Sequence, residues 1–209
     1  DDGRGELAWD DFIDNKREMV LIDKNWIEGK EIIEPDNKWN GVNDLITYLE
    51  TLFEANENVG YVTRSYENEN RHVPTKGCWD RTAGQLIQQL SQCNGDIGSV
   101  LGDYNAEVGA WIRFNPLDGK GIKNDNVTEF RYALVESDSM EIEKQNEIIR
   151  TLELPVACLV HSGKKSLHAI VRIDAVNYDE YRTRVDYLYA VCQKNGLKID
   201  SQNRHPSRL

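Results

Sequence analysis

The strongest constraint on the fold of this 209-residue chain is the succession of apolar runs and amphipathic stretches between residues 129 and 200. Apolar or alternating runs predict four strands, over residues 129–136, 156–161, 167–173 and from 197–200 onward. Helical spacing of apolar residues predicts two helices, over residues 140–152 and 178–195, with Gly196 as the C-cap of the second. The order β-α-β-β-α-β is typical of a ferredoxin-like or RRM-like α+β unit.

This element order also predicts how the strands meet. Right-handed crossovers give the sheet order 4-1-3-2, with strands 3 and 4 antiparallel to strand 1. The end of strand 1 should therefore lie beside the beginnings of strands 3 and 4.

The residues before 129 divide into two further segments. Residues 1–40 are acidic and without sustained periodicity, and we interpret them as an appended segment. Residues 41–128 predict an N-terminal α/β unit. Its expected elements are a helix over 45–53 with Asn43 as N-cap, a helix over 82–91 and a strand over 109–114. Residues 129–209 form the expected RRM-like catalytic unit, truncated at its C-terminus.

Charge and cysteine content set broad limits on function. The net charge of −11 arises almost wholly from residues 1–60, which hold 16 acidic and 6 basic residues, so a basic site can still form elsewhere. No apolar run reaches the roughly 20 residues needed to cross a bilayer, and no signal peptide is recognisable. We expect a cytoplasmic protein that makes no membrane contact. The four cysteines form no CxxC motif, and we expect reduced thiols, mostly in the core.

Three acidic residues converge on one edge of the predicted sheet. Glu136 and Asp138 end strand 1 and point to the same side of an extended backbone, and Asp200 approaches from strand 4. At about 4 Å and an effective dielectric near 20, each carboxylate pair would repel by roughly 4 kcal/mol. A hard divalent cation, Mg²⁺ or Mn²⁺, would relieve this repulsion.

Potential phosphate ligands lie beside these acids. Lys164, Lys165 and Ser166 form a turn before strand 3, and His168 follows on that strand. Arg204 and Arg208 lie further along the chain and could reach the same anion. Two metal ions about 4 Å apart can clamp both oxygens of a phosphoryl transfer. The combination predicts nucleotidyl transfer.

The motifs LVESD (134–138), KKSLH (164–168) and LKID (197–200) together resemble those of the archaeo-eukaryotic primase superfamily. The wider phrasing over residues 41–209 is similar to primase-polymerases of phages, plasmids and other mobile elements, which often carry a helicase domain further along the chain. The resemblance implies a DNA primase and polymerase that binds template, primer and nucleoside triphosphates.

The same resemblance implies roles for individual residues. Glu136, Asp138 and Asp200 would be the metal ligands, with His168 also in the catalytic set. Residues that would contact the incoming nucleotide are Lys164, Lys165, Ser166, His168 and Arg208. The first acid is Glu136 where the family pattern has Asp, which lengthens the ligand arm.

Two other functions are compatible with an RRM-like sheet. A rolling-circle replication initiator needs two histidines close together, and this chain has no His-x-His. A non-catalytic RRM stacks bases on aromatic residues of strands 1 and 3, and LHAIVRI of strand 3 has none.

Three further patterns carry less weight. The SGKKS turn is not a phosphate-binding loop, because Cys158 stands where the first glycine belongs and a strand follows it. The spacing of His72, Cys78 and Cys93 fits no usual zinc site. Arg113 and Asn115 are candidates for contacting template or nucleotide.

Overall fold

The computed structural model describes residues 39–69, 71–163 and 166–209, which divide into two units. The C-terminal unit comprises Phe130–Pro206, and the N-terminal unit comprises the described residues up to Glu129 together with Ser207–Leu209. The acidic segment expected over residues 1–40 lies outside the described residues except at its last two positions. Each unit is described by itself.

One antiparallel sheet forms the centre of the C-terminal unit. Its strands are β5 (Phe130–Val135), β6 (Val156–His161) and β7 (Leu167–Ala175), in the order β5-β7-β6. Both neighbouring pairs are antiparallel, so the three strands have the arrangement expected for strands 1, 3 and 2.

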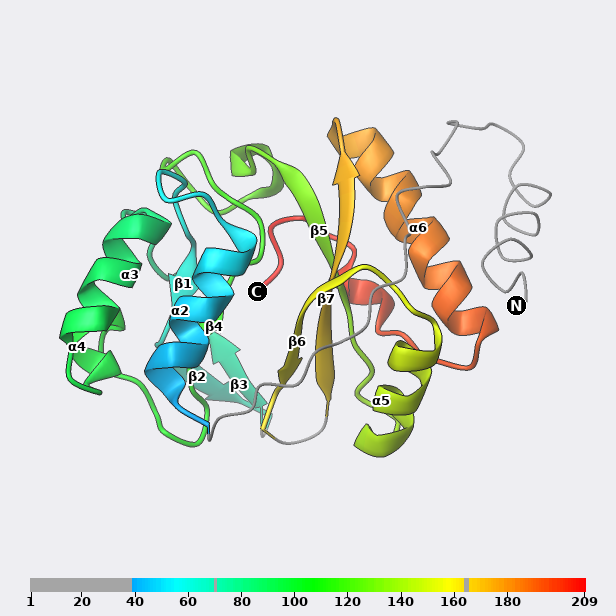
Figure 1. Ribbon diagram of the computed structural model, residues 1–209, viewed down its shortest axis with the longest axis horizontal. Helices are drawn as coiled ribbons and strands as arrows, with labels where there is room; N and C mark the ends of the chain where they lie inside the picture. Colours follow the sequence, from blue (N-terminus) through cyan, green and yellow to red (C-terminus); the bar gives the residue numbers. More distant parts are fainter. Residues whose placement is uncertain (1–38, 70, 164–165) are drawn as a thin grey trace. The chain divides into compact units, whose positions relative to one another are not determined.

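Two helices cover one face of this sheet. Helices α5 (Ile142–Thr151) and α6 (Tyr178–Lys194) lie on the same side of it (Figure 1). Alternate residues of β7, from Leu167 to Ala175, enter the core that these helices close. The other alternate residues, His168 among them, therefore lie on the opposite face. Asn195 is the C-cap of α6, and Gly196 is the residue after it, with φ +91°, so the predicted cap was one residue late.

The predicted fourth strand is wrong. Residues 197–200 form no strand, and three of their backbone N–H groups donate to separate partners. The N–H of Leu197 closes the end of α6 on Cys192 O, and that of Lys198 donates to Met140 Sδ at 3.2 Å. Asp200 N donates to Glu136 O at 3.2 Å, and the 3-10 turn η3 (Ser201–Asn203) follows at once. The segment thus lies beside the end of β5 without forming a ladder.

Capped helices frame the N-terminal unit. Helix α2 (Gly41–Leu52) begins at Asn40, whose side chain accepts hydrogen bonds from two backbone N–H groups; the predicted N-cap, Asn43, is inside the helix. Helix α3 (Ala83–Gln92) begins with a capping box between Thr82 and Gln85. A short helix, α4 (Ile97–Leu101), was not predicted.

Short strand pairs complete this unit. Strand β1 (Tyr61–Val62) pairs with β4 (Trp111–Ile112), and the hairpin β2 (Ser65–Asn68)–β3 (Arg71–Pro74) stands apart. The strand predicted over 109–114 is reduced to two residues, and β1 to β3 were not predicted. A 3-10 turn, η2 (Asn124–Asn126), precedes the C-terminal unit.

The four cysteines match the expectation of mostly buried, reduced thiols only in part. All four cysteines are free, but only Cys192 is buried, and burial raises the pKa of its thiol to about 12.

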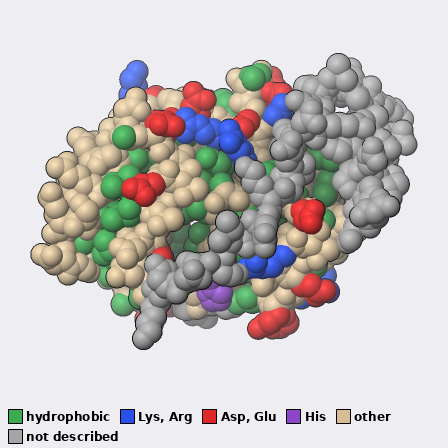
Figure 2. All heavy atoms as spheres, in the orientation of Figure 1, with side chains coloured by type: hydrophobic (Ala, Val, Ile, Leu, Met, Phe, Trp, Pro, Cys, Tyr) green, Lys and Arg blue, Asp and Glu red, His purple; other side chains and the backbone are tan. Residues whose placement is uncertain are grey.

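On the face that Figure 2 shows, acidic and basic side chains are interspersed. In the described residues we find no helix that is both long and apolar enough to cross a membrane.

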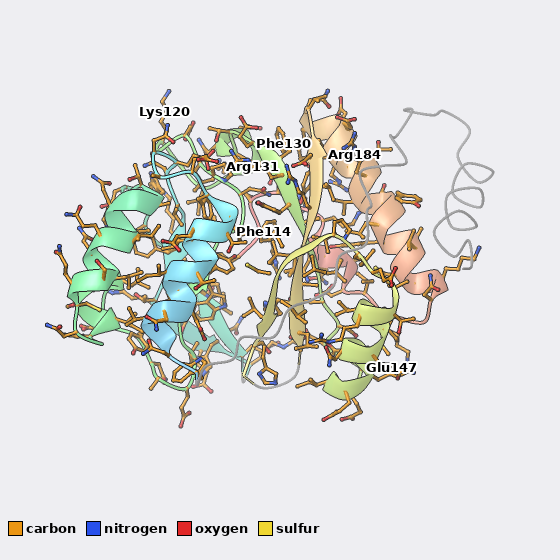
Figure 3. The ribbon with its side chains drawn as sticks, viewed as in Figure 1. Phe114, Lys120, Phe130, Arg131, Glu147 and Arg184 are labelled. Atoms are coloured by element: carbon orange, nitrogen blue, oxygen red, sulfur yellow. The ribbon has the colours of Figure 1, made fainter. Side chains whose placement is uncertain are left out.

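A buried ion pair joins α6 to the end of β7. Arg184 lies on α6 (Figure 3), and its Nη1 donates to the carbonyls of Ile173 and Asp174 at 2.6 and 3.0 Å. Its Nη2 lies 2.8 Å from Glu180 Oε1, and both side chains are about nine-tenths buried. Arg184 therefore satisfies a carboxylate and two carbonyls that water does not reach freely.

We expect Arg184→Met to lower the free energy of unfolding by about 3–5 kcal/mol, because it leaves a buried carboxylate unpaired. Guanidinium denaturation followed by circular dichroism measures this loss. Arg172→Met is the matched control, since its pair with Asp174 is exposed and should contribute less than about 1 kcal/mol. Equal losses in the two variants would contradict the assignment.

Candidate metal centre

The register of β5 and β7 brings the first two site residues together. Val135 pairs with Ala169, so the next positions outward, Glu136 and His168, lie opposite each other on the face away from α5 and α6. His168 Nε2 lies 3.1 Å from Glu136 Oε2, and the two side chains are 33% and 11% exposed. The pairing of β5 with β7 is therefore enough to bring the imidazole of His168 into contact with the carboxylate of Glu136.

Asp138 and Asp200 complete a cluster with Glu136. Each of the three residues offers one carboxylate oxygen, and these oxygens lie within 4.8 Å of one another. The hydrogen bond from Asp200 N to Glu136 O fixes the Asp200 backbone beside the end of β5. The Asp200 side chain also accepts from Gln202 N at 3.0 Å, which orients it at the start of η3.

The chemistry of this cluster fits a hard cation. Three carboxylates at this spacing repel one another, and oxygen is the donor that Mg²⁺ and Mn²⁺ prefer. The hydroxyl of Ser137, between Glu136 and Asp138, is buried and has no hydrogen-bond partner among the described residues. The group could therefore hold a metal ion.

A buried phenol lies close to the acids. Tyr189 Oη donates to Leu134 O at 2.7 Å and so joins α6 to the end of β5, just before Glu136. Burial, and then the charges of Cys192, Glu136 and Asp200, raise the pKa of Tyr189. The tyrosine is therefore a neutral support of the site.

The residues predicted to bind phosphate are only partly brought together. Ser166 is 4% exposed, and its Oγ donates to Ser162 Oγ at 3.4 Å, so it closes the turn before β7. Lys164 and Lys165 lie outside the described residues. Arg204 pairs with Asp186 within the C-terminal unit. Arg208 belongs to the N-terminal unit.

A residue that was not predicted from the sequence joins the two loops of the site. Gln145 of α5 is fully buried; its Nε2 donates to Met140 O at 2.6 Å, and its Oε1 accepts from Leu167 N at 3.1 Å. Met140 lies two residues after Asp138, and Leu167 directly precedes His168. Met140 Sδ in turn accepts the N–H of Lys198, two residues before Asp200. One amide and one thioether thus join the segments that carry the acids and His168.

The other metal hypothesis finds no support in the structure. Within residues 39–69, 71–163 and 166–209, the three carboxylates are the only group of three or more His, Cys, Asp or Glu that could hold an ion. His72, Cys78 and Cys93 form no such group.

We expect Gln145→Leu to weaken Mn²⁺ binding by about 10-fold or more, because supports behind metal ligands contribute on that scale. Titration followed by electron paramagnetic resonance measures the affinity. Ile149→Val, a buried change one turn along α5, is the control and should leave Mn²⁺ affinity unchanged. Equal affinities in Gln145→Leu and the wild type would show that the site does not depend on this amide.

Comparison with known proteins adds no relative. No family model, curated protein or solved structure matches the chain. What the centre does is therefore inferred from its residues and their geometry, together with the motifs that carry the resemblance.

Proposed function

We propose that the chain is the core of a DNA primase and polymerase that transfers nucleotides on a DNA template with two divalent ions, Mg²⁺ or Mn²⁺. One observation carries the proposal. Glu136 and Asp138 follow β5 and Asp200 lies more than 60 residues further on, yet oxygens of all three lie within 4.8 Å of one another where His168 contacts Glu136. The same four residues carry the three motifs that resemble the archaeo-eukaryotic primase superfamily.

The site residues would have two roles: some would hold the metal ions and others would contact the nucleotide. Glu136, Asp138 and Asp200 would hold the ions, which when bound supply charge neutralisation for the attacking and leaving oxygens. His168 would donate from its imidazole to a phosphate oxygen of the incoming nucleotide, and its contact with Glu136 keeps the ring at the metal edge. Ser166, Lys164, Lys165 and Arg208 are the further phosphate contacts that the resemblance implies.

The strand order supports an RRM-like catalytic unit in part. The succession β5-α5-β6-β7-α6 and the sheet order β5-β7-β6 are those of such a unit without its fourth strand. An RNA-binding RRM is disfavoured because Tyr132, on the site face of β5, is 7% exposed and offers little ring surface for stacking. A rolling-circle initiator is disfavoured because the cluster consists of carboxylates rather than paired histidines.

The three acids should act as one unit. We expect Glu136→Gln, Asp138→Asn and Asp200→Asn each to abolish primer extension in Mg²⁺ or Mn²⁺, since each removes one charged ligand. In a chelator, their unfolding temperatures should equal or exceed that of the wild type because repulsion is relieved. Asp174→Asn, an exposed acid outside the site, is the control. Near-normal extension by one of the three variants would remove that residue from the site.

His168 should serve the nucleotide. We expect His168→Ala to raise the KM for nucleoside triphosphate by about 10-fold, the size of one charge-assisted contact, and to leave Mn²⁺ affinity largely intact. Calorimetry with each ligand separates the two effects. His161→Ala, at the exposed end of β6, is the matched control. Loss of Mn²⁺ binding with nucleotide binding retained would reassign His168 to holding Glu136.

A further inference from the structure

An arginine in the N-terminal unit is buried without a counter-charge. Arg113 follows β4 and is 7% exposed, and its Nε is buried with no hydrogen-bond partner among the described residues. No ion pair or side-chain hydrogen bond of Arg113 occurs in the described part of the chain. A buried charge is ordinarily paired, because leaving it unpaired costs several kcal/mol.

The fold makes room for this side chain. Arg113 N donates to Gly60 O at 2.8 Å, which extends the β1–β4 pairing by one residue. A Cβ at position 60 would lie 2.6 Å from Arg113 Cδ and 3.0 Å from Nε, so only glycine lets the side chain lie against this backbone. The local structure therefore holds the guanidinium in place even though no described residue of the unit forms an ion pair with it.

A second arginine approaches the first. Ser207 Oγ donates to Asn124 Oδ1 at 2.7 Å and fixes the C-terminal residues to the N-terminal unit, where the charge of Arg208 acts on Arg113. Burial, and then the like charge of Arg208, lower the pKa of Arg113 to about 10, and no carboxylate contributes a compensating rise. Arg208 is exposed and likewise has no ion pair within the described residues.

We propose that Arg113 and Arg208 form a phosphate-binding site in the N-terminal unit, with Arg113 as its buried anchor. Two neighbouring cations, one of them desolvated, are stable together when an anion lies between them, and guanidinium groups match phosphate oxygens in pairs. The identity of the phosphate rests on the proposed function, which supplies a nucleoside triphosphate as one source. A phosphodiester of the template offers the same chemistry, and competition distinguishes the two sources.

The test uses the whole chain in a chelator, so that the carboxylate cluster takes no part, with inorganic tripolyphosphate as the probe. We expect tripolyphosphate to raise the unfolding temperature of the wild type. Arg113→Met should weaken its binding by about 10-fold or more, and Arg208→Ala should also weaken it. A nucleoside triphosphate should displace the probe; displacement by a single-stranded oligonucleotide alone would assign the site to a nucleic-acid backbone.

Stability without ligand separates a binding role from a structural one. We expect ligand-free Arg113→Met to unfold at the same or a higher temperature than the wild type, because an uncompensated buried charge is removed. Arg71→Met, an exposed arginine of β3, is the matched control and should bind tripolyphosphate normally. Failure of the wild type to bind the probe, or normal binding by Arg113→Met, overturns the site. Asp138→Asn should bind the probe normally in either case, so the anion site and the proposed catalysis can fail separately.

Discussion

The antiparallel register of β5 and β7 is the constraint on which the candidate metal centre depends. Because Val135 pairs with Ala169, the next positions outward bring Glu136 and His168 to one face. A one-residue shift of either strand would turn that strand's side chains over and send its polar group toward the apolar core. The core under α5 and α6 therefore specifies the site, since the residues that fill it determine which side chains are left for the other face.

Beyond the strand ends, the site is held by single polar contacts rather than by a ladder. Gln145 donates to the carbonyl of Met140 and accepts from the N–H of Leu167. Met140 Sδ accepts from the N–H of Lys198, in the segment that was expected to form the fourth strand. The loss of that strand and the position of Asp200 thus have one cause: the backbone of residues 197–200 is bonded to the loop after β5 and to α6. Because so few residues hold the three loops in place, each of them contributes much to the geometry of the site.

The sequence predicted the parts of the molecule that periodicity determines. The three strands of the C-terminal sheet, their order and both long helices follow from apolar spacing, and the adjacency of Glu136 and His168 follows from that order. The fourth strand was predicted from the apolar pattern at 197–200, but it does not form, and Asp200 reaches the other two acids without it. Gln145 was not singled out from the sequence, although a polar residue among the apolar residues of a helix face is a signal of a buried hydrogen bond. Residue pairs as short as β1 and β4 leave no periodic pattern to find.

Each unit contains like charges that lie close together. In the C-terminal unit these are the carboxylates of Glu136, Asp138 and Asp200, and in the N-terminal unit the guanidinium of Arg113 beside Arg208. Folding tolerates such sets because the rest of each unit is well packed, and the cost falls when a ligand supplies the missing charge. A divalent ion would neutralise the carboxylates, and a phosphate would neutralise the guanidinium groups. Each proposed ligand therefore brings the charge that would relieve the repulsion within its own unit.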